Sequence, residues 1–116
     1  FTPESLITDL HRAALRGARD DRTALTNLFS GRPARSLVNR LMREIGPMSD
    51  QAPPFPTAGR ALAPLKQRAE AQGSSDFSSL WSGQAASLYR EVGSGELTRQ
   101  LAADAEKRLR ALGSKG

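Results

Sequence analysis

The stretch from Pro53-Pro54-Phe55-Pro56 to Ser79-Leu80-Trp81-Ser82-Gly83-Gln84 contains the only Trp of the chain and its tightest cluster of prolines. Aromatic residues make up 5% of the sequence, so Phe55 and Trp81 in this stretch stand out. The segments on both sides show the spacing of amphipathic helices. Composition and spacing alone predict a soluble, mainly α-helical domain and no particular activity.

The length and composition of the chain limit its architecture. A chain of 116 residues forms one small domain at most, whereas a barrel of eight strand-helix units needs about 250 residues. Hydrophobic residues make up 38%, a lean supply for a core, and the chain begins at Phe1 without the pattern of a signal peptide. We therefore expect a piece of a larger protein. With no Cys in the chain, a disulfide framework, a thiol nucleophile and a thiolate metal site are excluded.

The charge raises nucleic acid as a partner, because the net charge is +5 and the isoelectric point is about 10.7. The basic residues are spread over both halves, however, and most have an acid nearby, as in Arg19-Asp20-Asp21-Arg22. Phosphate binding favours clustered, unpaired Lys and Arg. We therefore favour an ordinary basic surface over a nucleic-acid interface. No run of 18 apolar residues that would suit a membrane span occurs.

The first helix is predicted from Pro3 to Arg16, because Thr2-Pro3-Glu4 combines a hydroxyl cap, a Pro in the first turn and an acid. Gly17 is a suitable stop. His11 lies on this helix without a second His or a Cys to form a site with it. We favour a histidine at the surface or the boundary over a catalytic base.

The next segments predict one strand and one helix. Residues 23–29 are β-branched and apolar, which favours a strand, and we find no second strand to pair with it. A helix is predicted from Pro33 to Ile45. Arg32 and Arg35 flank its first turn, where free N–H groups would suit a phosphate, and two ordinary surface arginines are the alternative.

Three further helices are predicted over residues 57–71, 85–92 and 94–112. Phe55 lies between prolines, which suits an aromatic ring presented to a cleft or an anchor on the core. Gly83 permits a close approach of the backbone, and Gln84 is a two-way hydrogen-bonding group. Together they suit contact with a flat polar ligand or an ordinary helix junction.

Several separated runs resemble a known family when they are taken in order. They are Thr26-Asn27-Leu28-Phe29-Ser30-Gly31-Arg32-Pro33-Ala34-Arg35, Asn39-Arg40-Leu41-Met42, Phe55-Pro56 and Asp76-Phe77-Ser78-Ser79-Leu80-Trp81-Ser82-Gly83-Gln84. Together they resemble the C-terminal part of the nitronate monooxygenases, formerly called 2-nitropropane dioxygenases. The resemblance extends over nearly the whole chain.

The resemblance implies a flavin-dependent oxidoreductase in which a TIM barrel holds FMN and a smaller helical domain covers the active site. Residues 1–18 would then be the closing helix of the barrel and residues 19–116 the lid domain. The expected fold is mainly α with one short orphan strand, incomplete as it stands. The implied reaction oxidises an alkyl nitronate to a carbonyl compound and nitrite with oxygen.

The resemblance also implies where the site residues lie. The active-site histidine of the family belongs to the barrel, upstream of Phe1, and His11 does not match it. No catalytic residue and no metal ligand is therefore expected in this chain, and the isolated segment should be inactive. Phe55, Trp81, Gly83 and Gln84 are the expected cofactor-binding or cleft-lining residues. Some relatives carry tyrosines and a lysine where this chain has Gly59 and Ala63, so the substrate stays open.

The expected partners are a nitronate or nitroalkane, oxygen and the upstream barrel, with neither nucleic acid nor a membrane. The oligomeric state stays open, and the expected location is the cytoplasm, whose reducing conditions suit a chain without Cys. The alternative is a non-catalytic helical protein-interaction module, complete at 116 residues. Such a module would bind its partner through the surface from Phe55 to Trp81.

Overall fold

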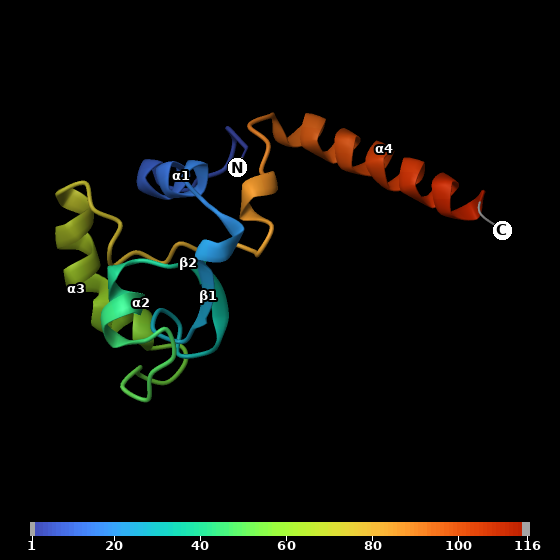
Figure 1. Ribbon diagram of the computed structural model, residues 1–116. Coiled ribbons are helices and arrows are strands. Elements are labelled where there is room, and N and C mark those ends of the chain that lie inside the picture. The colour runs from blue at the N-terminus through green and yellow to red at the C-terminus, as the bar shows by residue number, and fades with distance from the viewer. Residues whose placement is uncertain (1, 115–116) are drawn as a thin grey trace. The chain divides into compact units, whose positions relative to one another are not determined.

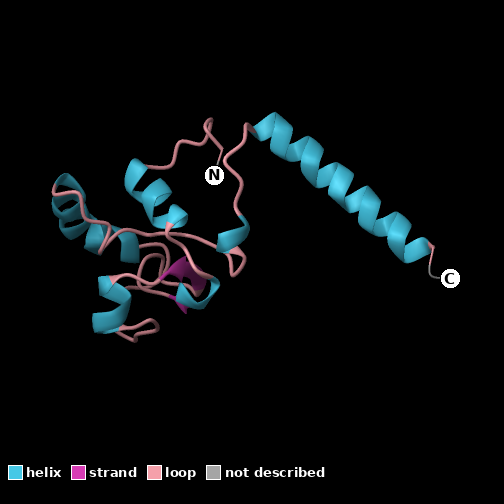
Figure 2. Ribbon diagram, turned by 45° about the horizontal axis from the view of Figure 1, so that its top comes forward, coloured by secondary structure: helices cyan, strands magenta, loops and turns pink. Residues whose placement is uncertain are grey.

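The computed structural model describes residues 2–114. The chain forms two compact units: residues 7–88 form the first, and residues 2–6 together with residues 89–114 form the second. Figure 2 shows short strands among helices and loops, so the fold is mainly helical with a small sheet. The expected division between residues 18 and 19, which assigns the first segment to a barrel, stays a prediction.

The sheet of the first unit consists of two antiparallel strands, β1 (Thr23–Thr26) and β2 (Ala34–Leu37), with Thr23 opposite Leu37 (Figure 1). The expectation of an orphan strand is therefore wrong. Its partner lies in the segment that we predicted as the start of a helix at Pro33. The chain reverses at Gly31, whose φ of +86° suits a residue without a side chain.

The helix after β2 is short. Asn39 ends the strand segment and caps α2 (Arg40–Ile45), because its Oδ1 accepts the N–H of Met42 at 3.3 Å. Asn39 is buried, and its Nδ2 donates to the carbonyls of Ser75 at 3.2 Å and Ser78 at 2.9 Å. The cap thus also ties α2 to the segment that leads to Trp81.

The other helices of the first unit agree with the predictions to different degrees. α3 (Ala58–Ala71) has the predicted bounds and continues through Pro64. α1 (Asp9–Arg16) begins six residues later than predicted, because Thr8 accepts the N–H of His11 and acts as its cap. The predicted helix over residues 85–92 is only the 3₁₀ helix η2 (Ala86–Leu88). A further 3₁₀ helix, η1 (Asp20–Arg22), precedes β1.

The core of the first unit joins the turn after β1 to α2. Its buried residues are Leu28, Phe29, Leu41 and Met42, of which Met42 is 1% exposed. Partly buried side chains from α3 and the loops pack around them, among them Leu62 and Phe77. The core therefore holds the turn after β1 in a fixed place, and this turn supports the candidate site.

The second unit contains α4 (Ser94–Gly113), close to its predicted bounds. No side chain caps it locally, but the carboxylate of Glu4 accepts the N–H of Ser94 at 3.2 and 3.1 Å through its two oxygens. Along the helix, Arg90 donates to Gln100 at 2.9 Å and to Asp104 at 3.1 Å. None of the residues of α4 is buried. Among the described residues, no helix is long and apolar enough to cross a lipid bilayer.

Candidate functional site

Trp81 lies at the edge of the small sheet. It pairs with Ser36 of β2 in an isolated bridge, and residues 80–82 run antiparallel to β2 with two backbone hydrogen bonds to it. The indole contacts the ring of Phe29 edge to face, with centroids 5.8 Å apart and an angle of 88° between the planes. The side chain stays 39% exposed. The indole thus packs against a core residue while part of its surface is open.

Phe55 packs against the same turn, through Arg32 and Gly31. The guanidinium of Arg32 stacks over the Phe55 ring at 4.5 Å from its centroid. Gly31 faces the backbone of residues 53–55 so closely that a Cβ there would lie 2.7 Å from the carbonyl oxygen of Pro53. Phe55 is 52% exposed. The turn of residues 29–32 therefore contacts both aromatic residues that the sequence singled out.

Gly83 and Gln84 follow Trp81 on an exposed loop. Within the described chain, no heavy atom lies within 4 Å of a Cβ built on Gly83, so the close approach that the sequence suggested is not made to residues 2–114. Gln84 is exposed as well. Its amide is therefore free to bind a group outside the described residues, and its role at the site stays a prediction.

The anion site, one of two alternatives for Arg32 and Arg35, loses its basis. It required the first turn of a helix at Pro33, and that segment is strand β2. Arg35 instead donates from Nη1 to Thr23 Oγ1 at 3.1 Å across the two strands, while Arg32 lies on Phe55. Arg35 thus bonds across the sheet, and Arg32 packs on the aromatic ring.

His11 makes a contact that the sequence does not indicate. Its Nε2 lies 3.2 Å from the carbonyl oxygen of Trp81, 70 residues away. The prediction of a boundary histidine agrees with its partial exposure. No local pattern on α1 indicates this partner, because the contact depends on where the segment after α3 returns to the sheet.

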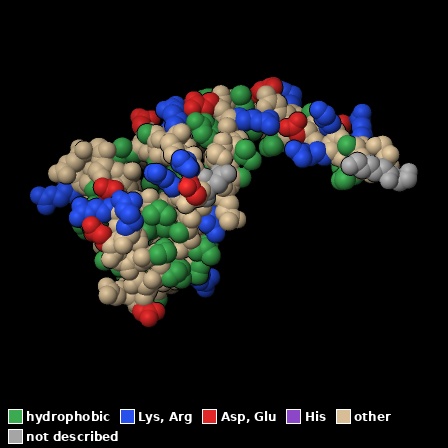
Figure 3. Space-filling view, viewed as in Figure 1, with side chains coloured by type: hydrophobic (Ala, Val, Ile, Leu, Met, Phe, Trp, Pro, Cys, Tyr) green, Lys and Arg blue, Asp and Glu red, His purple; other side chains and the backbone are tan. Residues whose placement is uncertain are grey.

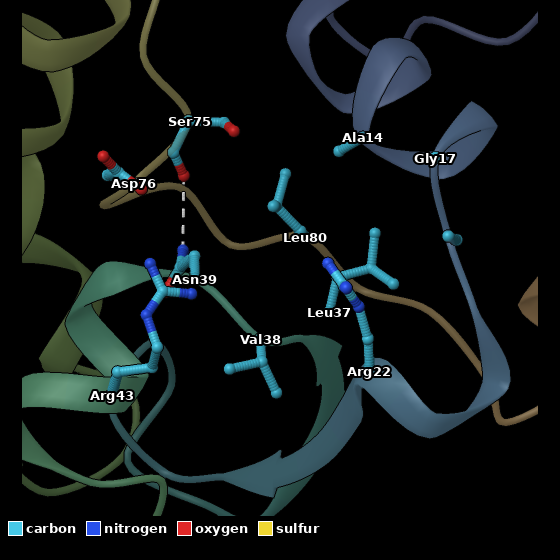
Figure 4. Close-up of a pocket in the computed structure, with 11 residues that line it drawn as sticks. Ala14, Gly17, Arg22, Leu37, Val38, Asn39, Arg43, Ser75, Asp76 and Leu80 are labelled. Atoms are coloured by element: carbon cyan, nitrogen blue, oxygen red, sulfur yellow. Dashed lines mark hydrogen bonds between the residues drawn. The ribbon is translucent and has the colours of Figure 1, made fainter.

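The first unit also has a hollow of about 190 Å³ between α1, β2 and residues 75–80. Figure 4 shows Arg22 and Arg43 beside it, with Val38 and Leu80 between them. A second hollow of about 240 Å³, largely apolar, lies between α2, α3 and residues 51–53. Neither hollow is lined by Phe55, Trp81, Gly83 or Gln84. Phe55, Trp81, Gly83 and Gln84 are each exposed.

Arg40 is a charged residue of the first unit whose pKa is shifted. The side-chain hydrogen bond and the charge of Glu44, followed by the charge of Asp76, raise the pKa of Arg40 above its ordinary value, and Arg40 also lies over Phe77. Within residues 2–114, no three His, Cys, Asp or Glu side chains gather in a way that suits a metal ion. The surface therefore offers aromatic rings, the guanidinium of Arg32 on Phe55 and the amide of Gln84.

Comparison with known proteins assigns the chain to a family. The sequence model described as nitronate monooxygenase matches residues 1–104. The chain belongs to the nitronate monooxygenase family. The resemblance that the sequence suggested is thereby confirmed.

Individual relatives agree with this assignment. The chain is 42% identical over 100 residues to a nitronate monooxygenase of Pseudomonas aeruginosa, covering 85% of this chain and 28% of the relative. A probable nitronate monooxygenase of Bacillus subtilis is 35% identical over 99 residues, covering 84% and 28%. A crystal structure of a nitroalkane oxidase from Streptomyces ansochromogenes shares the fold with a TM-score of 0.82 and 40% identity, covering 96% of this chain and 31% of that one. The chain thus spans less than a third of each relative.

Proposed function

We propose that this chain is the C-terminal part of an FMN-dependent nitronate monooxygenase. The proposed enzyme oxidises alkyl nitronates to carbonyl compounds and nitrite, with oxygen as the second substrate. The observation that carries the proposal is the family match over residues 1–104 on a chain that spans less than a third of its relatives. The isolated segment is expected to be inactive.

The exposed hydrophobic surface of the chain supports the proposal that another part of the protein covers it. Large hydrophobic side chains are exposed on the first unit, among them Leu25, Met48, Phe55, Trp81 and Leu88. Figure 3 shows hydrophobic side chains gathered over the strands. Apolar patches of this kind are typical of surfaces that bind another protein or domain. The proposed partner for these surfaces is the barrel, with the described segment as its closing helix and lid.

The residues of the candidate site fit a flat heteroaromatic group such as the flavin of FMN. Phe55 and Trp81 expose parts of their rings, and the exposed amide of Gln84 both donates and accepts hydrogen bonds. When bound, the flavin supplies the transfer of electrons between the nitronate and oxygen. In our proposal, Phe55, Trp81, Gly83 and Gln84 contribute the wall of the cleft beside it.

Each of these residues has a separate role in the proposed enzyme. The rings of Phe55 and Trp81 exclude water from the cleft, and Arg32 holds the Phe55 ring in place by stacking on it. Gln84 orients a polar edge of the flavin or the substrate by hydrogen bonding. The side chains of Phe, Trp and Gln do not titrate, so the proposal assigns no proton transfer to Phe55, Trp81 or Gln84. The proposed location is the cytoplasm.

The test uses the native polypeptide purified from its source. We would measure its intact mass, its visible absorption spectrum and the nitrite that it releases from the nitronate of 2-nitropropane. The proposal predicts a mass roughly three times the 12.5 kDa of this chain, flavin bands and nitrite release that consumes oxygen. A colourless 12.5 kDa protein that releases no nitrite would overturn it, and the interaction module would replace it.

A further inference from the structure

Residues 80–82 form two backbone hydrogen bonds with β2 on one side of the segment. The N–H of Leu37 donates to the carbonyl of Leu80 at 2.9 Å, and the N–H of Ser82 donates to the carbonyl of Arg35 at 3.3 Å. Trp81 lies opposite Ser36 between these two bonds. In an antiparallel pair, the backbone N–H and C=O of such a residue point away from the partner strand. The carbonyl of Trp81 therefore faces the outer edge of the sheet.

The imidazole of His11 occupies this outer edge. Its Nε2 lies 3.2 Å from the carbonyl oxygen of Trp81. Because a carbonyl oxygen only accepts hydrogen bonds, the hydrogen must lie on Nε2. The backbone of His11 is fixed as well, since its N–H donates to Thr8 Oγ1 at 3.2 Å in the cap of α1. The donor thus sits in the first turn of a capped helix.

α1 also contacts the chain beyond the loop. It packs against η2, whose Ala86 is buried. The loop of residues 82–85, with the exposed Gln84, therefore lies between two places where α1 holds the chain: the His11 bond at Trp81 and the contact with η2. A change in the His11 bond therefore changes the backbone path of residues 82–85 and with it the position of Gln84.

We infer that His11 is a positioning residue for the segment from Trp81 to Gln84. It fixes the point where this segment leaves the sheet and thereby the direction of the Gln84 amide. Its importance for activity rests on the proposed function, in which Gln84 contacts the flavin or the substrate. The hydrogen bond itself is independent of that proposal, so the two are tested by different measurements.

The hydrogen bond is tested on the chain itself, which contains a single His and a single Trp. Nitrogen-15 NMR of the imidazole reports its tautomer, and Trp fluorescence reports the surroundings of Trp81. We expect the neutral imidazole in the Nε2–H form. His11→Leu, which removes the donor, should change the emission of Trp81, and His11→Gln, whose amide nitrogen reaches a similar place, should restore it. An Nδ1–H tautomer, or unchanged emission in His11→Leu, would overturn the inference.

The consequence for function is tested on the native polypeptide. His11→Leu should raise KM or weaken flavin retention several-fold, and His11→Gln should recover most of the loss. If Gln84→Ala impairs the enzyme and His11→Leu does not, the positioning role is wrong while the proposed function stands. If the polypeptide neither holds flavin nor releases nitrite, the proposed function fails, and NMR and fluorescence still decide whether His11 positions Trp81.

Discussion

Gly31 is important both for the folding of the first unit and for its candidate site. Its φ is +86°, and a Cβ there would lie 2.6 Å from the carbonyl carbon of Pro54, an atom of the backbone. Gly73 has a similar φ of +77°, but nothing lies within 4 Å of its Cβ position. A comparison of the two glycines therefore separates the strain of the backbone from the collision with residues 53–55.

We predict that Gly31→Ala lowers the free energy of unfolding by about 4 kcal/mol or more, or prevents folding. Gly73→Ala should lower it by only about 1–2 kcal/mol, because it meets the backbone strain alone. Urea unfolding followed by circular dichroism measures both. Equal losses in the two variants would show that residues 53–55 move away from Gly31 at little cost.

Gln84 is the site residue whose prediction can be tested most cleanly, because its side chain is exposed and its loss removes little packing. We predict that Gln84→Ala in the native polypeptide lowers FMN occupancy or kcat/KM by about tenfold, the effect of one lost hydrogen bond in a cleft. Gln67→Ala is the matched control, since Gln67 is exposed on α3. Both variants should unfold at the same temperature as the parent. Unchanged kinetics in Gln84→Ala would remove Gln84 from the site.

At the scale of elements, the sequence predicts helices well where a single apolar stripe belongs to a single helix. α3 and α4 lie close to their predicted bounds. The segment of residues 33–45 differs because its apolar residues, although at helical spacing, belong to two elements. Leu37 is buried in strand β2, and Leu41 and Met42 are buried in helix α2. The break at Asn39 depends on its bonds to Ser75 and Ser78. These partners are more than 30 residues away, and a local pattern contains no information about them.

Contacts between distant residues also decide the arrangement of the candidate site. The residue types at Phe55 and Trp81 drew attention in the sequence because aromatic side chains are scarce. Their common support, the turn of residues 29–32, was not predictable, since it depends on contacts between distant segments. The bond from His11 to Trp81 is of the same kind. Sequence therefore indicates which residues to consider, and tertiary packing decides which of them meet.

The start of α4 shows how a distant carboxylate replaces a local cap. Hydrogen bonds from the backbone N–H of Glu4 itself and from Ser94 lower the pKa of the Glu4 carboxyl below its ordinary value. A lowered pKa in the folded state means that the charged form stabilises the fold. This contribution is fully present above the ordinary pKa of a Glu, about 4.3, and is lost as the pH falls through the lowered value.

We therefore predict that Glu4→Gln reduces the helical content of the chain at neutral pH and removes part of its loss on acidification. Circular dichroism between neutral and acidic pH measures the difference from the parent. Glu106→Gln is the control, because Glu106 pairs with Arg110 in the distal half of α4, at 3.3 Å. It should leave the acid-dependent loss in place. The same acid response in the parent and in Glu4→Gln would show that Glu4 does not cap α4.

At the scale of the whole molecule, α4 carries an apolar stripe that the described residues do not bury. Leu101 is 57% exposed and Leu109 68% exposed. Fully burying a Leu side chain contributes about 1.5–3 kcal/mol, so a stripe of this kind is a large contribution to stability if another surface covers it. In our proposal, the rest of the enzyme supplies that surface.

The stripe allows one substitution to be compared in two settings. Leu109→Gln should change the stability of the isolated chain by less than about 0.5 kcal/mol, because the side chain is exposed and Leu and Gln have similar helix propensities. In the native polypeptide, the same substitution should lower stability by about 2 kcal/mol if Leu109 is covered. Lys107→Gln, on an exposed position of the same helix, should have little effect in either setting. Thermal unfolding of the six proteins gives the comparison. Equal effects of Leu109→Gln in the chain and in the native polypeptide would mean that α4 stays uncovered there, and the exposed stripe would no longer support a larger enzyme.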